Sequence, residues 1–179
     1  MKKILLTISL VFIAFISVGQ ENLVFTEVIA VDGTSQDELY NRAKMFVVDV
    51  FVSANDVMQL DDKENGQIVC KGSMIYNSSI YSASAMTNGH IDFTFKIFLK
   101  EGRYKYDFCD FQHKTLRSDG YNFGYITTSD VPSVKYSTKG WRNKVWLDLK
   151  STIDTKINYG MRLDMKKAME VPVNGSDDW

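Results

Sequence analysis

Apolar and polar residues alternate along two neighbouring stretches of the chain, residues 91–99 and residues 104–108. In both stretches every second residue is Ile, Phe, Leu or Tyr, and the pair Glu101-Gly102 lies between them. A period of two is typical of a half-buried β-strand. Two such runs joined by an X-Gly pair predict a β-hairpin.

The register of this hairpin follows from its turn. If Glu101-Gly102 is a two-residue loop, Lys100 pairs with Arg103 and every further pair is determined. A slip by one residue would set aromatic residues opposite charged ones, so we expect this register. The predicted pairs are Leu99–Tyr104, Ile97–Tyr106 and Phe95–Phe108 on the apolar face, and Phe98–Lys105, Lys96–Asp107 and Thr94–Cys109 on the other. The outward face, with Lys96, Phe98, Lys105 and Phe111, is our candidate partner surface.

Helical spacing of apolar residues occurs twice outside the hairpin. Residues 35–54 begin with Ser35 and Glu38, the residue types of a capping box, and continue with a wide apolar face. Residues 141–170 predict a long amphipathic helix, with Gly160 as the place for a kink.

The rest of the chain completes an α+β pattern. Residues 23–31 predict a first strand, and residues 57–76 predict two strands around an acidic turn. Residues 77–89 are small and polar, which favours a loop, and a short extra strand is expected near residues 121–126. The order of elements is β-α-β-β-β-β-α, and it predicts an antiparallel sheet of about five strands with two helices packed on one face. We therefore expect a domain over residues 20–113, an irregular linker over 114–140, a C-terminal helix over 141–170 that packs on the domain, and a disordered tail over 171–179.

The N-terminus has the composition of a secretory signal peptide over residues 1–19. Two lysines precede an apolar run that is shorter than the roughly 20 residues of a spanning helix. Cleavage is expected between Gly19 and Gln20, and the alternative is an uncleaved membrane anchor. No cysteine lies near this boundary, so a lipoprotein is not expected. The mature protein should be periplasmic or secreted, without a transmembrane segment.

Removal of Lys2 and Lys3 with this segment changes the formal charge from −1 to −3. A mildly acidic chain lacks the basic patch that nucleic-acid binding needs. The remaining chain is long enough to form one domain with its own core.

Few residue types point to catalysis or to a metal. The spacing Cys109-x-x-x-His113 spans about 13 Å on a strand, whereas zinc ligands must converge to within about 2.3 Å of the ion. His90 and His113 are predicted at exposed strand ends, and the sequence contains no Gly-x-Ser-x-Gly elbow. Cys70 is predicted on the core face and Cys109 on the opposite face, so a disulfide is not expected. We therefore expect no catalytic residues, metal or cofactor.

Three segments resemble a known family. They are "SQDELYNRAKMFVVDVF" for a first helix, "GQIVCKGSM" for a central strand and "FKIFLKEGRYKYDF" for a hairpin. The chain resembles, from Val28 to His113, the exported Bacteroidetes-type domain of unknown function number 4468, which is described as having a TBP-like fold. A Gly-rich element of that family is reduced here to Lys71-Gly72-Ser73. The resemblance implies a curved antiparallel sheet with two helices behind it, and it implies no catalytic residues.

Two hypotheses about function remain at this point. The first is an exported, non-catalytic module that binds a protein or another envelope component. The alternative is a hydrolase that acts on an envelope or dietary polymer. A histidine within hydrogen-bond reach of a carboxylate in a pocket would favour the second hypothesis.

Overall fold

The computed structural model of the protein describes residues 21–132 and 140–172. The predicted signal peptide at residues 1–19, its cleavage site at Gly19 and Gln20, and residues 173–179 of the predicted tail lie outside the described residues. The same holds for residues 133–139 of the predicted linker.

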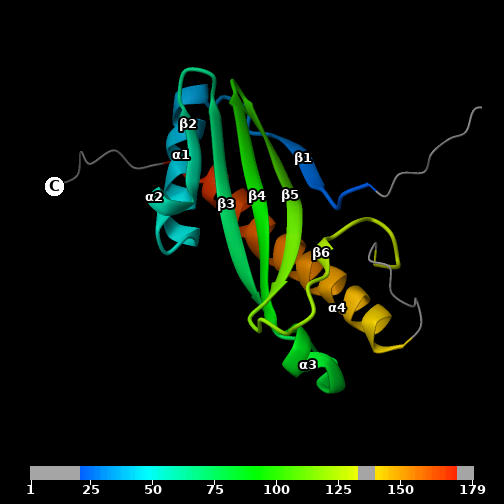
Figure 1. Cartoon of the computed structure of the whole chain (residues 1–179). Helices are drawn as coiled ribbons and strands as arrows, with labels where there is room; N and C mark the ends of the chain where they lie inside the picture. Colours follow the sequence, from blue (N-terminus) through cyan, green and yellow to red (C-terminus); the bar gives the residue numbers. More distant parts are fainter. Residues whose placement is uncertain (1–20, 133–139, 173–179) are drawn as a thin grey trace, which may run out of the picture.

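The described strands form one open, curved antiparallel sheet (Figure 1). Its order is β1-β5-β4-β3-β2, and β6 pairs with the far end of β5. The expected sheet of about five strands is thus confirmed in type, with six strands in number. The strands are β1 (Phe25–Ala30), β2 (Met58–Asp62), β3 (Gln67–Tyr76), β4 (Gly89–Lys100), β5 (Arg103–Thr115) and β6 (Gly124–Tyr125).

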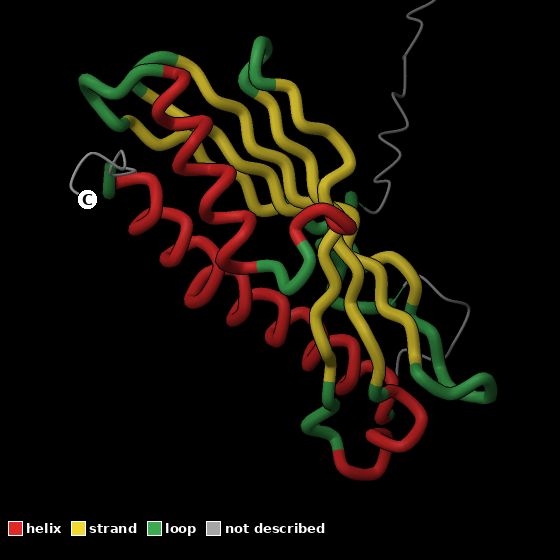
Figure 2. The backbone as a smooth tube through the Cα atoms, turned by 90° about the vertical axis from the view of Figure 1, so that its left-hand side faces the viewer, coloured by secondary structure: helices red, strands yellow, loops and turns green. Residues whose placement is uncertain are grey.

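Two long helical elements cover one face of this sheet (Figure 2). The first is α1 (Gln36–Val50), which begins at Ser35, where the serine Oγ accepts the backbone N–H of Glu38. The second is the C-terminal helix, made of α4 (Trp141–Lys156), a π-helical turn η1 (Ile157–Met161) and α5 (Arg162–Glu170). Gly160 lies inside the π-helical turn, so the regular hydrogen-bond pattern changes where a kink was expected.

Two short helices were not predicted. They are α2 (Ala54–Val57) and α3 (Tyr81–Thr87), and α3 lies in the segment predicted as a loop. Thr87 and Ala83 are buried against the rest of the protein, and Thr87 Oγ1 donates to the carbonyl oxygen of Ala83. The Ser- and Ala-rich sequence of α3 has no helical spacing of apolar residues. Tertiary packing therefore stabilises this helix.

Part of the segment predicted as a linker after residue 113 belongs to the sheet, and the short strand expected near residues 121–126 is confirmed as β6. Strand β5 continues to Thr115, and β6 pairs with it. Phe123 and Ile126 are buried, and the carbonyl oxygen of Ile126 accepts the N–H of Leu23 at 3.0 Å. The described residues after β5 thus extend the sheet at the edge next to β1.

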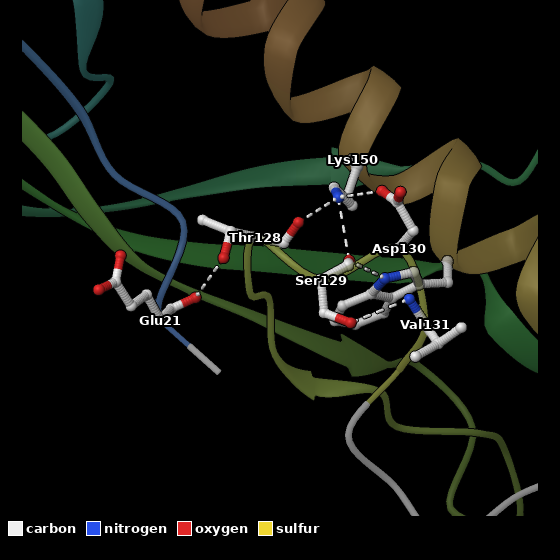
Figure 3. Close-up of polar contacts among 7 residues, drawn as sticks. Glu21, Thr128, Ser129, Asp130, Val131 and Lys150 are labelled. Carbon is white, nitrogen blue, oxygen red and sulfur yellow. Dashed lines mark hydrogen bonds and ion pairs between the residues drawn. The ribbon is translucent and has the colours of Figure 1, made fainter. Parts of the chain in front are cut away.

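Lys150 of α4 binds the residues that follow β6 through their carbonyl oxygens and a carboxylate (Figure 3). Lys150 Nζ donates to the carbonyl oxygens of Thr128 and Ser129, at 2.9 and 3.0 Å, and forms an ion pair with Asp130 at 3.1 Å. Thr128 in turn donates its backbone N–H to the carbonyl oxygen of Glu21. One lysine of α4 therefore holds the chain that follows β6, and this arrangement has a structural role.

The predicted hairpin register is confirmed. Lys100 pairs with Arg103, Lys96 with Asp107 and Thr94 with Cys109 in the β4–β5 ladder. The apolar face of the hairpin packs under α1, where the rings of Phe95 and Phe108 stack at 4.3 Å. Phe46 of α1 meets Phe95 edge-on.

Candidate binding surface on the open face

The face of the sheet opposite α1 and the C-terminal helix is called the open face below. Lys96, Phe98 and Lys105 lie on it as predicted, since each alternates with buried neighbours on its strand. In the register, Phe98 and Lys105 form one row with Val28 of β1, and Lys96 forms the next row with Asp107 and Thr26. Three of the four residues of the predicted partner surface are therefore side by side.

The prediction for Phe111 was wrong. Its side chain is fully buried on the helix side, with its ring centroid 5.8 Å from that of Phe25 and 5.9 Å from that of Phe93. The cause is a β-bulge between Cys109 and Gln112, where two residues of β5 oppose the single residue Phe93. Asp110 adopts a φ of 57° there, and this reverses the alternation after Cys109.

The hairpin end of the open face contains a hollow of about 410 Å³, which we call the tip pocket. Its floor is apolar, with Phe98 from β4 and Val28, whose side chain is 61% exposed. Its rim is cationic, because Lys100, Arg103 and Lys105 all line it. The residues that line the tip pocket include no carboxylate.

The carboxylates near the tip pocket are already engaged. Asp107 accepts from Lys105 Nζ and from Thr26 Oγ1, and the same ammonium lies 5.5 Å from the centre of the Phe98 ring. Glu101 is directed to α1, where its carboxylate accepts the backbone N–H of Gln36. Among the described residues neither Lys100 nor Arg103 forms an ion pair. The tip pocket therefore has a local positive charge on a chain whose formal charge is −1.

Sequence reasoning missed Val28, Lys100 and Arg103 as parts of this surface. The two cations could have been found, because the predicted register already placed Lys100 and Arg103 on the face of Phe98 and Lys105. Val28 could not, because the pairing of β1 with β5 joins segments that are distant in the sequence. No local pattern specifies which strand neighbours which.

The prediction that His113 is exposed at a strand end was also wrong. The imidazole is fully buried, with Nε2 2.8 Å from the carbonyl oxygen of Thr87, while Nδ1 accepts the backbone N–H of Phe123. This pattern assigns the neutral tautomer with its proton on Nε2. Burial lowers the pKa of His113, and the hydrogen bond to Thr87 opposes this shift. Both ring nitrogens are occupied by backbone groups, so this histidine is not available as a base.

Cys109 and His113 lie on opposite faces of β5, because the bulge separates them. In residues 21–132 and 140–172, no group of three His, Cys, Asp or Glu side chains could hold a metal ion. His90, at the start of β4, forms no hydrogen bond to a carboxylate within the same residues.

Cys70 and Cys109 are free thiols, as expected. Burial raises the pKa of each to about 11. Since the thiolate is the reactive form, neither cysteine is activated as a nucleophile near neutral pH.

The described helices are either too short or too polar to cross a bilayer.

The curved antiparallel sheet with its helices on one face defines a TBP-like α+β domain. The family described as a domain of unknown function (DUF4468) with TBP-like fold matches residues 25–114, half of the chain, and the protein belongs to this family. The resemblance of the sequence to this family is thereby confirmed.

Two solved structures share the fold. A DUF4468 family protein from Bacteroides ovatus is 14% identical, with a TM-score of 0.52 over 86% of this chain and 90% of that one. A TBP-like protein from Parabacteroides distasonis is 12% identical, with a TM-score of 0.55 over 84% of this chain and 94% of that one. At this identity the likeness concerns the fold alone. No relative was found among curated proteins.

Proposed function

We propose that the protein is an exported, non-catalytic binding module whose tip pocket receives an acidic segment of a partner protein. The observation that supports this function most directly is the tip pocket, with Val28 and Phe98 as its floor and three cations as its rim. Export is supported by the signal-peptide pattern of residues 1–19.

The chemistry of the pocket specifies the kind of partner. A large apolar side chain on the partner would cover Val28 and Phe98 and remove their exposed surface from water. Carboxylates next to it would meet Lys100 and Arg103, and Arg can bind a carboxylate through two parallel hydrogen bonds. An acidic segment with an aromatic residue satisfies both parts of the pocket.

A polypeptide is favoured over a small anion because one further lysine, Lys96, follows the tip pocket along the strands. Lys96 lies in the next row from Phe98 and Lys105, and its own cross-strand neighbour Asp107 is engaged by Lys105 and Thr26. A segment that lies across the hairpin can therefore place one acidic residue near the tip pocket and another near Lys96. Such charge complementarity increases the association rate and makes binding depend on salt.

The hydrolase alternative has no observation in its favour. The buried His113 has backbone partners on both nitrogens. His90 interacts electrostatically with Asp92 but forms no hydrogen bond to a carboxylate among the described residues, and Asp92 is paired with Lys114. The condition for this alternative, a histidine hydrogen-bonded to a carboxylate in a pocket, is not met in that part of the chain.

The experiment uses the mature chain, residues 20–179, and a fluorescent synthetic peptide in which Glu alternates with Phe and Trp. Fluorescence anisotropy should show binding that weakens as sodium chloride is raised from 50 to 500 mM. The double variant Lys100→Glu, Arg103→Glu should bind at least about tenfold more weakly, which corresponds to 1.4 kcal/mol. The matched control is Lys166→Glu, Lys167→Glu, which reverses two exposed charges on α5 and should leave binding unchanged.

Three outcomes would contradict the proposal. The first is equal binding by the wild type and the tip-pocket variant. The second is equal binding of a peptide with Lys in place of Glu. The third is retention by vesicles of anionic phospholipid, or self-association into a dimer through the tip pocket, without binding of the peptide.

A further inference from the structure

The β-bulge creates a second hollow on the open face, about 510 Å³ in volume, which we call the bulge pocket. It lies over the other half of the strands, away from the hairpin tip. Val57 of α2 contributes to its lining, and the other lining residues come from four strands, among them Lys71 of β3, Asp92 of β4, Asp110 and Gln112 of β5, and Tyr125 of β6. The bulge determines its form, because Asp110 and Gln112 both remain on the open face while Phe111 turns inward.

The bulge pocket is polar and has no net charge, unlike the tip pocket. Its two lysines, Lys71 and Lys114, are balanced by Asp92 and Asp110. Lys114 and Asp92 already form an ion pair at 2.7 Å. Because the four charges sum to zero, the pocket as a whole favours neither an anion nor a cation. The available groups are instead hydrogen-bond donors and acceptors of several kinds, as a neutral polar ligand requires.

Asp110 and Gln112 are free to bind such a ligand. Within the described residues, the Asp110 carboxylate has only a weak contact, from Cys109 Sγ at 3.4 Å. In the same residues the Gln112 side chain forms no hydrogen bond, although its backbone is paired with Tyr125 and Asp92. The pocket thus presents the two carboxylate oxygens of Asp110 and the side-chain amide of Gln112 to a ligand.

An aromatic ring completes the pocket. Tyr125 is 53% exposed although it is in a strand, and it lines the pocket from the edge of the sheet. An exposed tyrosine offers an apolar face with a polar end. Hydroxyl-bearing rings with one apolar face are the ligands that match an aromatic surface beside carboxylate and amide groups.

We propose that the bulge pocket binds a neutral saccharide. The sugar ring lies against Tyr125, and its hydroxyl groups donate to the Asp110 carboxylate and exchange hydrogen bonds with Gln112 and Lys71. This site is separate from the tip pocket and does not depend on the acidic partner proposed above.

The test is a titration of the ¹⁵N-labelled mature chain, residues 20–179, with glucose, galactose, N-acetylglucosamine and cellobiose, up to 50 mM each. At least one sugar should shift the amide resonances of residues 109–114 and 124–126. Tyr125→Ala should weaken its binding by about tenfold or more. Tyr125→Phe keeps the ring and should retain most of the binding. Tyr159→Ala is the matched control, because it removes a 74% exposed tyrosine from the C-terminal helix.

The salt dependence separates this site from the tip pocket. Binding of a neutral sugar should be unchanged between 50 and 500 mM sodium chloride, and it should persist in the Lys100→Glu, Arg103→Glu variant. The proposal is overturned if none of the four sugars shifts resonances at the bulge. It is also overturned if Tyr125→Ala binds as tightly as the wild type.

Discussion

His113 illustrates how one side chain determines local structure in this protein. It connects α3, through the carbonyl oxygen of Thr87, to the segment before β6, through the N–H of Phe123. The Tyr76 ring packs edge-on against the imidazole at 5.4 Å. Protonation of Nδ1 would remove the acceptor for Phe123 and place a charge in this buried site. The neutral form is therefore part of the folded structure.

The pH dependence of stability should report this role. Because the pKa of His113 is lowered in the folded state, the unfolded chain binds the proton more readily below about pH 6.5. The stability that neutral His113 provides is complete above pH 6.5 and is lost as the pH falls through the lower, folded-state pKa. We expect the difference in unfolding free energy between wild type and His113→Gln to shrink from pH 7.5 to pH 5, as measured by urea denaturation.

Nuclear magnetic resonance gives a direct control for this prediction. The imidazole Cε1 proton of His113 should titrate below pH 6.5, and His90→Gln assigns the two histidine resonances. A His113 midpoint at or above 6.5 would show that the folded state does not favour the neutral form.

At the scale of single elements, two turns that join neighbouring strands contain a glycine with a positive φ. Gly66, before β3, has a φ of 60°, and a Cβ added there would lie 2.4 Å from the carbonyl oxygen of Leu99. Its own carbonyl oxygen accepts the N–H of Leu99 at 2.8 Å. Gly102, in the hairpin turn, has a similar φ of 69° but no atom within 4 Å of such a Cβ. The two glycines thus share a backbone conformation and differ in the space beside it.

Alanine substitutions at these glycines should separate the cost of a left-handed backbone conformation from the cost of a steric clash with β4. Gly102→Ala should destabilise the protein by about 1–2 kcal/mol, the cost of a left-handed conformation for a residue with a Cβ. Gly66→Ala should cost at least about 1 kcal/mol more, because the β4 backbone must also move away. Urea denaturation of both variants measures the difference. Equal losses would mean that the turn before β3 relaxes without disturbing β4.

The elements that sequence could predict are those with a continuous local pattern. The hairpin register followed from Glu101-Gly102 and the alternation on both sides of it, and the ladder has the predicted pairs from Lys100–Arg103 to Thr94–Cys109. The prediction failed after Cys109, where Phe111 is buried. Phe108 and Phe111 are three residues apart, which a regular strand with one apolar face does not allow, and this spacing was the available signal of a bulge.

Other features depend on contacts between distant segments. The helix α3 is held by the burial of Ala83 and Thr87, and His113 is buried by the residues after it, including Phe123. The tip pocket requires Val28 to lie beside Lys105. The short polar sequence around α3 and the strand-end position of His113 contain no periodic signal for these contacts.

At the scale of the whole molecule, the C-terminal helix is part of the core. Its inner side chains are fully buried on the sheet and beside α1, although they lie beyond residues 25–114, which match the family. Arg42 of α1 donates to the carbonyl oxygen of Met169 at 2.6 Å, and Arg162 binds Glu27 of β1. Both structural neighbours cover more than four fifths of this chain, so their likeness extends past the family region. The buried residues of the helix are Val145, Trp146, Leu149, Ile153, Ile157, Met165 and Met169.

We therefore predict that a chain ending at Pro132 does not fold. Burial of one large apolar side chain contributes about 1.5–3 kcal/mol, so the seven buried residues together contribute roughly 10–20 kcal/mol as an upper estimate. A typical domain is stable by only about 5–15 kcal/mol in total. The shortened chain should lack a cooperative thermal transition by circular dichroism, whereas a domain that folds independently of the helix would retain one.

Within the full chain, Leu149→Ala should cost about 2–5 kcal/mol, while Leu147→Ala, at a side chain that is 44% exposed, should change stability by about 0.5 kcal/mol or less. Equal effects of these two substitutions would contradict the place of the helix in the core.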